Sequence, residues 1–414
     1  TTSQVSALST AAVAALTSDQ LVGFDTAQVS KLTVDQTKAL TAKQVAGLSS
    51  TQLNALTSSQ VRGLTTSQIV ALSSAQAKSL GTTQVTALSV EQVAAMETVD
   101  LAQIGTESIA AMSVSQVKAF TTQQVVALNT AQVVALTTDQ IKGMSSDLLR
   151  ALSTSNFNAL STDQLRIITS SSIAGLTTDA LRGLSTTKLA TLTSSQIGAF
   201  TSDAFASLTT NQIGTITTTQ LAAVTAGQIA ALSTTQIQSI GTDRVAKLNT
   251  SQLTAFGTTK LGNMTTSQVA ALTSDQVQGL STGAIAGLST AQMAKLTTSA
   301  LAGLTTHQVS ALETADVAAL GSAQLAALTS VQTAQLSTEQ MASLTASEVK
   351  GLSTTVVSKL SSSQLQAMST NATASLTTTQ VQSFIASQVS ALTTAQVAGL
   401  TSGQLNALGT DLIK

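Results

Sequence analysis

The chain repeats one pattern of apolar and polar positions every eight residues. Counted from Thr1, every eighth residue from Leu8 to Leu408 is Leu, Met, Phe, Ile or Val, which defines 51 consecutive octads followed by residues 409–414. Position 5 of the octad is apolar as well, so the apolar residues are separated alternately by three and by five positions. The exceptions at position 5 are Thr37, Ala77, Thr333 and Thr373.

The polar positions of the octad carry signals for the start of a helix. Position 1 is Thr, Ser, Asn, Asp or Gly except at Glu97, Glu313 and Ile385, and these residue types are the preferred N-caps. Position 4 is Gln in 34 of the 51 octads, and Ser/Thr-x-x-Gln is a capping box. The apolar residue before the cap and the one at position 5 form a hydrophobic staple. All three signals coincide in most octads and predict one helix in each.

Charged residues favour the same conformation. Asp at position 3 is followed by Lys or Arg at position 6 in five octads, and side chains three residues apart are neighbours on a helix but point to opposite faces of a strand. The predicted ion pairs are Asp35/Lys38, Asp139/Lys142, Asp147/Arg150, Asp163/Arg166 and Asp179/Arg182.

A single long helix is excluded by the period. At about 100° per residue, the apolar stripe would rotate by about 80° in every octad, so no continuous face would form. A coiled coil needs apolar spacings near 3.5 residues, whereas the spacing here averages about 4. We therefore expect a helix of roughly five to seven residues in each octad, followed by a sharp reversal. The alternative is a β-solenoid, because Thr and Val favour strands and an even period keeps each position on one face.

An array of such short units is stable only when the units stack on one another. The prediction is an all-α solenoid that runs as one continuous body over residues 1–414, with octads in 1–408 and a partial repeat in 409–414. Nine of the fifteen non-Leu residues at position 8 fall in every third octad, which favours three octads, or 24 residues, per coil. Position 7 is mostly Ala or Gly, small enough for neighbouring turns to approach closely.

Composition excludes several classes of function. Charged residues make up 9% of the chain and the net charge is −1. The chain therefore lacks the excess of basic residues that proteins use to bind nucleic acid or an anionic membrane. No Cys is present, so neither a disulfide framework nor a thiolate metal site can form. Ser and Thr interrupt the apolar positions in every octad, so no segment is apolar enough to insert in a membrane.

Candidate chemistry is sparse, and we expect no catalytic, cofactor-binding or metal-binding residue and no enzyme. His307 is the only histidine and lies at position 3, which faces solvent. The closest acidic cluster, Glu97 and Asp100 with Glu91 and Glu107, could hold a cation weakly. The favoured explanation for these acidic residues is that their negative charge compensates the dipole at a helix N-terminus.

Runs such as Thr393–Leu400, TTAQVAGL, resemble the Thr/Gln-rich short tandem repeats of large bacterial secreted and cell-surface proteins. The resemblance covers nearly the whole chain. It implies export and a role at the cell surface, in a filament or in an adhesin. It carries no functional residues over to this sequence.

The function we expect is structural: an extracellular fibre formed or spaced by end-to-end stacking of solenoids. Neither end of the sequence carries an atypical capping unit of the kind that solenoids use for solubility, and head-to-tail association that does not close gives filaments. The alternative is an adhesin stalk, or a rod that binds ice or a glycan through ladders of the Thr and Ser residues at positions 1 and 2. The expected partner is therefore another copy of the chain, or a surface ligand in the alternative.

Overall fold

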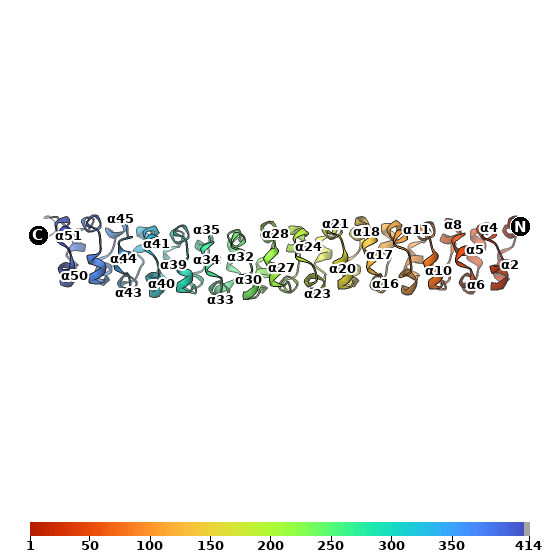
Figure 1. The fold of residues 1–414 in the computed structure, drawn as a ribbon, viewed down its shortest axis with the longest axis horizontal. Coiled ribbons are helices and arrows are strands. Elements are labelled where there is room, and N and C mark those ends of the chain that lie inside the picture. Colours follow the sequence, from red (N-terminus) through yellow and green to blue (C-terminus); the bar gives the residue numbers. More distant parts are fainter. Residues whose placement is uncertain (410–414) are drawn as a thin grey trace. The chain divides into compact units, whose positions relative to one another are not determined.

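A computed structural model describes residues 1–409, and these residues form one short helix in each of the 51 octads (Figure 1). No strand occurs in this part of the chain, so the all-α solenoid is confirmed and the β-solenoid alternative is wrong. Every helix begins at position 2 of its octad except α33, which begins one residue earlier.

The chain divides into two compact units at the junction of octads 26 and 27. Unit 1 comprises Thr1–Leu208 and unit 2 begins at Thr209. The eight-residue period continues through the junction without a change. A single continuous solenoid over the whole chain stays a prediction, and the part of the last repeat in residues 410–414 lies outside the described residues.

The helices of unit 1 are four to six residues long. They are α1 (Thr2–Ser6), α2 (Thr10–Ala15), α3 (Ser18–Val22), α4 (Thr26–Ser30), α5 (Val34–Ala39), α6 (Ala42–Gly47), α7 (Ser50–Asn54), α8 (Ser58–Gly63), α9 (Thr66–Val70), α10 (Ser74–Ser79), α11 (Thr82–Ala87), α12 (Val90–Ala95), α13 (Thr98–Leu101), α14 (Thr106–Ala111), α15 (Val114–Lys118), α16 (Thr122–Ala127), α17 (Thr130–Ala135), α18 (Thr138–Gly143), α19 (Ser146–Ala151), α20 (Thr154–Ala159), α21 (Thr162–Ile167), α22 (Ser170–Ile173), α23 (Thr178–Arg182), α24 (Thr186–Thr191), α25 (Ser194–Gly198) and α26 (Ser202–Ala206).

The helices of unit 2 have the same lengths. They are α27 (Thr210–Thr215), α28 (Thr218–Ala222), α29 (Ala226–Ala231), α30 (Thr234–Gln238), α31 (Thr242–Val245), α32 (Thr250–Thr254), α33 (Gly257–Gly262), α34 (Thr266–Ala270), α35 (Ser274–Gln278), α36 (Thr282–Ala286), α37 (Thr290–Met293), α38 (Thr298–Ala302), α39 (Thr306–Ser310), α40 (Thr314–Ala318), α41 (Ser322–Ala327), α42 (Ser330–Thr333), α43 (Thr338–Ala342), α44 (Ala346–Val349), α45 (Thr354–Val357), α46 (Ser362–Ala367), α47 (Thr370–Ala374), α48 (Thr378–Gln382), α49 (Ala386–Val389), α50 (Thr394–Gly399) and α51 (Ser402–Ala407).

Hydrogen bonding explains why the helices are slightly shorter than the predicted five to seven residues. In α2 the Val13 N–H donates to the Ser9 carbonyl, the α-helical spacing, but the Leu16 N–H donates to the Val13 carbonyl three residues back. The last turn is therefore of the tighter 3₁₀ type. Leu16 (φ −64°, ψ 142°) and the next N-cap, Thr17 (φ −73°, ψ 159°), are extended and reverse the chain.

Helices three octads apart pack on one another. Within unit 1, α5 contacts α2 and α8, and the same step recurs in unit 2, where α38 contacts α35 and α41. This confirms the 24-residue spacing between neighbouring coils for these helices. Positions 5 and 8 form the core between them: Val13 and Leu21 are fully buried, and Leu32 and Leu40 nearly so.

Small residues at position 7 allow these coils to approach closely, as predicted. A Cβ atom on Gly351 would lie 2.8 Å from the carbonyl carbon of Ser322, which occupies position 2 of the octad three units earlier. A Cβ on Gly63 would meet Val34, again at position 2 three octads earlier, at 2.6 Å. Both distances are shorter than van der Waals contact, so the local spacing depends on glycine.

The predicted ion pairs at Asp35, Asp139, Asp147 and Asp163 are not formed in the part of the chain that the structure describes, although the helices that they indicated are. Neither Asp147 with Arg150 nor the pairs at Asp35, Asp139 and Asp163 come within ion-pair distance in the described structure. The side chain at position 6 reaches instead toward the coil that follows, where the Arg150 Nε donates to the Gly175 carbonyl at 2.7 Å. A fixed backbone carbonyl replaces the exposed carboxylate as the partner of this arginine.

Candidate functional site

The glutamine at position 4 forms two sets of hydrogen bonds, and we call its surroundings the glutamine slot. In the octad of Gln60, the side-chain Oε1 accepts the backbone N–H of the N-cap Thr57 at 2.7 Å. Its Nε2 donates to the Val29 carbonyl at 2.9 Å and to the Leu32 carbonyl at 2.7 Å, four octads earlier. The slot thus consists of the position-4 side chain, its own N-cap, and the carbonyls of positions 5, 6 and 8 of the octad four units before it.

The slot satisfies backbone groups at both ends of short helices. The first N–H groups and the last carbonyls of any helix lack partners within it, and in a helix of one turn these are most of the backbone groups. One glutamine serves the N-terminus of its own helix and the C-terminus of a helix in a neighbouring coil. Gln44, Gln52, Gln68 and Gln76 repeat the arrangement and are buried.

Sequence reasoning found the first half of this site and missed the second. A capping box accepts Glu as well as Gln at its last position, because only the side-chain oxygen is used. Position 4 is nevertheless Gln in 34 octads and Glu in one, at Glu348, which keeps the cap bond from the Thr345 N–H at 2.6 Å. This preference for an amide over a carboxylate was the available signal that position 4 must also donate a hydrogen bond.

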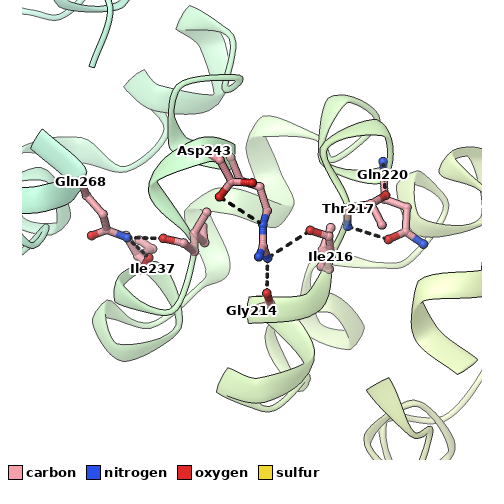
Figure 2. Close-up of polar contacts among 9 residues, drawn as sticks. Gly214, Ile216, Thr217, Gln220, Ile237, Asp243 and Gln268 are labelled. Atoms are coloured by element: carbon pink, nitrogen blue, oxygen red, sulfur yellow. Dashed lines mark hydrogen bonds and ion pairs between the residues drawn. The ribbon is translucent and has the colours of Figure 1, made fainter. Parts of the chain in front are cut away.

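Arg and Lys at position 4 also donate hydrogen bonds to the carbonyls of the slot, through charged groups instead of an amide. The Arg244 guanidinium donates to the carbonyls of Gly214 and Ile216, while Asp243 lies beside it with an N···O distance of 3.9 Å. Figure 2 shows these two carbonyls, and shows Gln268 directed at Ile237 in the same unit. The ammonium groups of Lys188 and Lys260 donate to the corresponding carbonyls, those of Asn158 and Ala230.

Asparagine also occupies the slot, although its side chain is shorter than that of glutamine. The Asn156 Nδ2 donates to the Leu128 carbonyl at 2.8 Å, and its Oδ1 accepts the Thr130 hydroxyl at 2.9 Å. Thr130 occupies position 2 of the octad three units earlier. The slot therefore has a second neighbour, a position-2 hydroxyl, which a short side chain can reach.

Two aspartates occupy the slot without offering a donor when they are ionised. Asp100 is 1% exposed and its Oδ1 accepts the Ser74 hydroxyl at 2.8 Å, whereas its Oδ2 is buried without a partner. Asp316 is 3% exposed and also has a buried Oδ2 without a partner. Burial raises the pKa of both carboxyl groups; the nearby Glu97 adds to the raise at Asp100, and the nearby Glu313 at Asp316.

The structure separates most of the candidate residues taken from the sequence. His307 is exposed at position 3, as predicted. Glu91, Glu97 and Glu107 are exposed, and only Glu97 shares an octad with Asp100. Across residues 1–409, no three side chains of His, Asp or Glu come together as a metal-binding group.

In unit 2, exposed hydroxyl side chains recur along the surface. In unit 2 the helices α33, α36, α39, α42, α45, α48 and α51 each contact the next, and position 2 of each carries a hydroxyl side chain. We call these residues the hydroxyl ladder; all are exposed or half-buried. They are Thr258, Thr282, Thr306, Ser330, Thr354, Thr378 and Ser402. Within the described range, no helix has the length and apolar character needed to cross a membrane.

Comparison with known proteins identifies a tandem repeat in parts of the chain. Six stretches are similar to the ALTTAQ repeat family, and these are residues 93–130, 118–146, 146–178, 173–210, 245–282 and 309–346. No curated protein matches the chain. The chain is thus a tandem-repeat protein whose described residues form an all-α solenoid in each unit.

Proposed function

We propose that the protein is a structural component that forms or spaces an extracellular fibre by end-to-end stacking of its solenoids. The observation that carries this proposal is the direction of the glutamine slot. The amides of Gln60 and Gln92, like those of other buried position-4 glutamines, point to the octad four units earlier, and the carbonyls that receive them belong to C-terminal ends of helices. An octad array therefore has one end rich in free donors and one end rich in free acceptors.

The first octads of the chain present the donor end. Gln4 and Gln20 are exposed and Gln28 is partly exposed, whereas every position-4 glutamine of unit 1 from Gln36 onward is buried. Octads that precede Thr1 in a longer polypeptide would cover the same groups that a second copy would cover. The chemistry of this end is that of the slot in either case.

The last described octads present the complementary surface. Val397 and Leu405 are at position 5, which is buried almost everywhere else, and are 41% and 37% exposed. The carbonyls of these residues are the kind that receive an amide inside the array. Joining a donor end to an acceptor end would repeat an interface that the solenoid already contains many times, so no new complementarity is needed.

The test is sedimentation velocity and negative-stain electron microscopy of the 414-residue chain over a concentration series. We expect particles whose length grows with concentration while their width stays constant. Fixed-length particles at every concentration would refute end-to-end stacking. Growth in width would indicate lateral association and would also contradict the proposal.

A matched pair of variants locates the contact. Gln4→Glu with Gln20→Glu keeps the cap bond, as Glu348 does, but turns two end donors into acceptors. Loss of about 1.4 kcal/mol or more from these bonds would shift assembly to at least about tenfold higher concentration. Gln123→Glu with Gln278→Glu adds the same charge at exposed positions within the array and should leave assembly unchanged.

The hydroxyl ladder favours a second candidate function, a stalk or rod that binds ice or a glycan. Its seven side chains come from helices that contact one another in series, so they present repeated hydroxyl groups along one column of unit 2. Regularly spaced hydroxyls can hydrogen-bond a regular surface. Both functions require export of the chain from the cell.

Substitution of ladder residues separates the two functions. Thr282→Val, Thr354→Val and Thr378→Val remove hydroxyls without adding bulk, and the fold accepts Val at position 2 in Val34 and Val90. Binding to cellulose, chitin or ice crystals that is lost in this triple variant would support the surface-binding function. Absence of binding by the unmodified chain would refute it, and unchanged assembly in the variant is expected if the fibre function is correct.

A further inference from the structure

Two octads combine features that occur nowhere else in the array. Asp occupies position 4 only at Asp100 and Asp316, and Glu occupies position 1 only at Glu97 and Glu313. Both substitutions fall in the same two octads, ETVDLAQI and ETADVAAL. In these two octads, carboxylates therefore replace both the usual hydroxyl N-cap at position 1 and the usual amide at position 4.

The hydrogen bonds of Asn156 indicate which backbone group lies opposite the unpartnered Oδ2 of Asp100. Asp and Asn have the same shape, and both accept a position-2 hydroxyl three octads earlier with one oxygen, from Ser74 to Asp100 and from Thr130 to Asn156. The other branch of Asn156 donates to the Leu128 carbonyl, 28 residues earlier. The equivalent partner of the Asp100 Oδ2 is the Leu72 carbonyl, which also accepts and cannot donate.

The Asp316 octad repeats this conflict. Thr290, at position 2 three octads earlier, hydrogen-bonds the Asp316 carboxylate, and the equivalent carbonyl 28 residues earlier belongs to Leu288. Its Oδ2 is buried and unpartnered, as in Asp100. A buried acceptor that faces another acceptor is costly unless something positive lies between them.

Other slots show what these carbonyls accept. The ammonium groups of Lys188 and Lys260 and the guanidinium of Arg244 each bring a positive charge to carbonyls of the octad four units earlier. The carbonyl group of the slot therefore accommodates a cation. Compensation of the helix dipole explains exposed acids near a helix start, but it does not explain a buried carboxylate oxygen without a partner.

We propose that each of these octads binds a hard divalent cation, of which Ca²⁺ is the probe, between the Asp carboxylate, the Glu at position 1 and the carbonyls of the octad four units earlier. All donors are oxygens, which is the ligand set that Ca²⁺ prefers. The two carboxylates carry a formal charge that balances the charge of a divalent cation. The carbonyls equivalent to those used by glutamine are at Ile69, Val70 and Leu72 for the first site.

The number of protein carboxylates sets the expected affinity. Each site has two, fewer than high-affinity sites use, so dissociation constants of about 10⁻⁴–10⁻³ M are expected, as in extracellular calcium modules. Burial raises the pKa of Asp100 and Asp316, which is consistent with a carboxylate whose charge lacks a partner in the metal-free protein.

The first test is isothermal titration calorimetry of the full chain with CaCl₂. We expect two ions per chain in the unmodified protein, one in Asp100→Asn, one in Asp316→Asn, and none in the double variant. Asn156 shows that the slot accepts Asn, so these variants should keep their fold. Asp35→Asn changes an exposed acid at position 3 and should leave both sites intact.

A second measurement distinguishes a metal ion from a proton in the slot. In hydrogen exchange, Ca²⁺ should increase protection near Leu72 and Leu101 in the unmodified chain at pH 7, and not in the double variant. Lack of binding, or binding that survives both substitutions, overturns the proposal. It is also overturned if protection falls as the pH rises through the raised pKa of the two Asp carboxyl groups to the same extent with and without Ca²⁺, since a proton would then be the partner.

Discussion

The contribution of the glutamine slot can be measured with two adjacent residues of one octad. Gln124 is 1% exposed, and its Nε2 donates to the Val93 carbonyl at 2.8 Å and to the Met96 carbonyl at 2.7 Å. Its Oε1 accepts the Thr121 N–H at 2.9 Å. Gln123, the residue before it, is exposed at position 3. Gln124→Ala and Gln123→Ala therefore remove the same atoms from a slot and from the surface.

The magnitude follows from the three bonds. At about 1 kcal/mol net for each hydrogen bond, Gln124→Ala should cost about 3 kcal/mol of local stability, whereas Gln123→Ala should change it by less than about 0.5 kcal/mol. A long repeat array does not unfold as one two-state system, so the global midpoint is a poor measure. Hydrogen exchange followed by mass spectrometry reports the local opening free energy instead.

The expected result is a fall of about 100-fold in the protection of amides near Val93–Met96 and Thr121–Val125 in Gln124→Ala, because about 1.4 kcal/mol corresponds to a factor of ten. Protection in octads outside the neighbouring coils should not change. Equal protection in the two Ala variants would refute the claim that the slot stabilises the array.

Gln124→Glu separates the two halves of the slot. It keeps an oxygen for the Thr121 N–H, as Glu348 does for Thr345, but places a carboxylate against two carbonyls. At pH 7 the loss of protection should exceed that of Gln124→Ala, because a buried charge lacks a partner. At pH 4 part of it should return, since the protonated acid can donate to one carbonyl. A loss smaller than that of the Ala variant at pH 7 would show that only the cap half matters.

Three further predictions concern single positions, each read by hydrogen exchange of the local octads. Thr37→Val should stabilise its octad by about 1 kcal/mol, because it replaces a buried hydroxyl that only bonds its own N-cap carbonyl with a methyl group; unchanged protection would contradict this. Gly257→Ser should destabilise by roughly 1 kcal/mol because φ is 64°, whereas Gly105→Ser, at φ −64°, should gain a few tenths of a kcal/mol as a cap. Gly351→Ala should cost about 1–3 kcal/mol through the clash with Ser322, and a neutral result would show that the coils can separate without loss.

The sequence predicted the features that depend on residues within one octad. Helix starts, capping boxes and the reversal between octads all follow from contacts three to five residues apart. The step of three octads was also predicted, from the distribution of the non-Leu residues at position 8. The expected ion pair of Asp147 with Arg150 does not form, because the arginine donates instead to the Gly175 carbonyl of the next coil, 25 residues later. Local spacing alone could not rank these two partners.

Features that depend on the exact placement of neighbouring coils were not predictable. The amide of Gln60 reaches carbonyls 28 and 31 residues earlier, a distance that only the geometry of the coil defines. Among glycines at position 1, Gly257 takes a positive φ while Gly241 and Gly105 stay extended, and no sequence signal distinguishes them. The unpartnered oxygen of Asp100 likewise could not be predicted from the sequence, because the acidic residues of its octad are explained equally well by compensation of the helix dipole.

The direction of the slot also constrains how the chain can associate. A two-fold symmetric dimer through the first octads would place the amides of Gln4 and Gln20 against the same amides of the partner copy. Donors would then face donors, and the carbonyls at the opposite end would remain unpaired, so such a dimer gains none of the bonds found inside the array. Only a head-to-tail contact pairs the two kinds of group. If the chain assembles through the slot, as we propose, the assembly must therefore be polar, and it would continue until one end is covered by different chemistry.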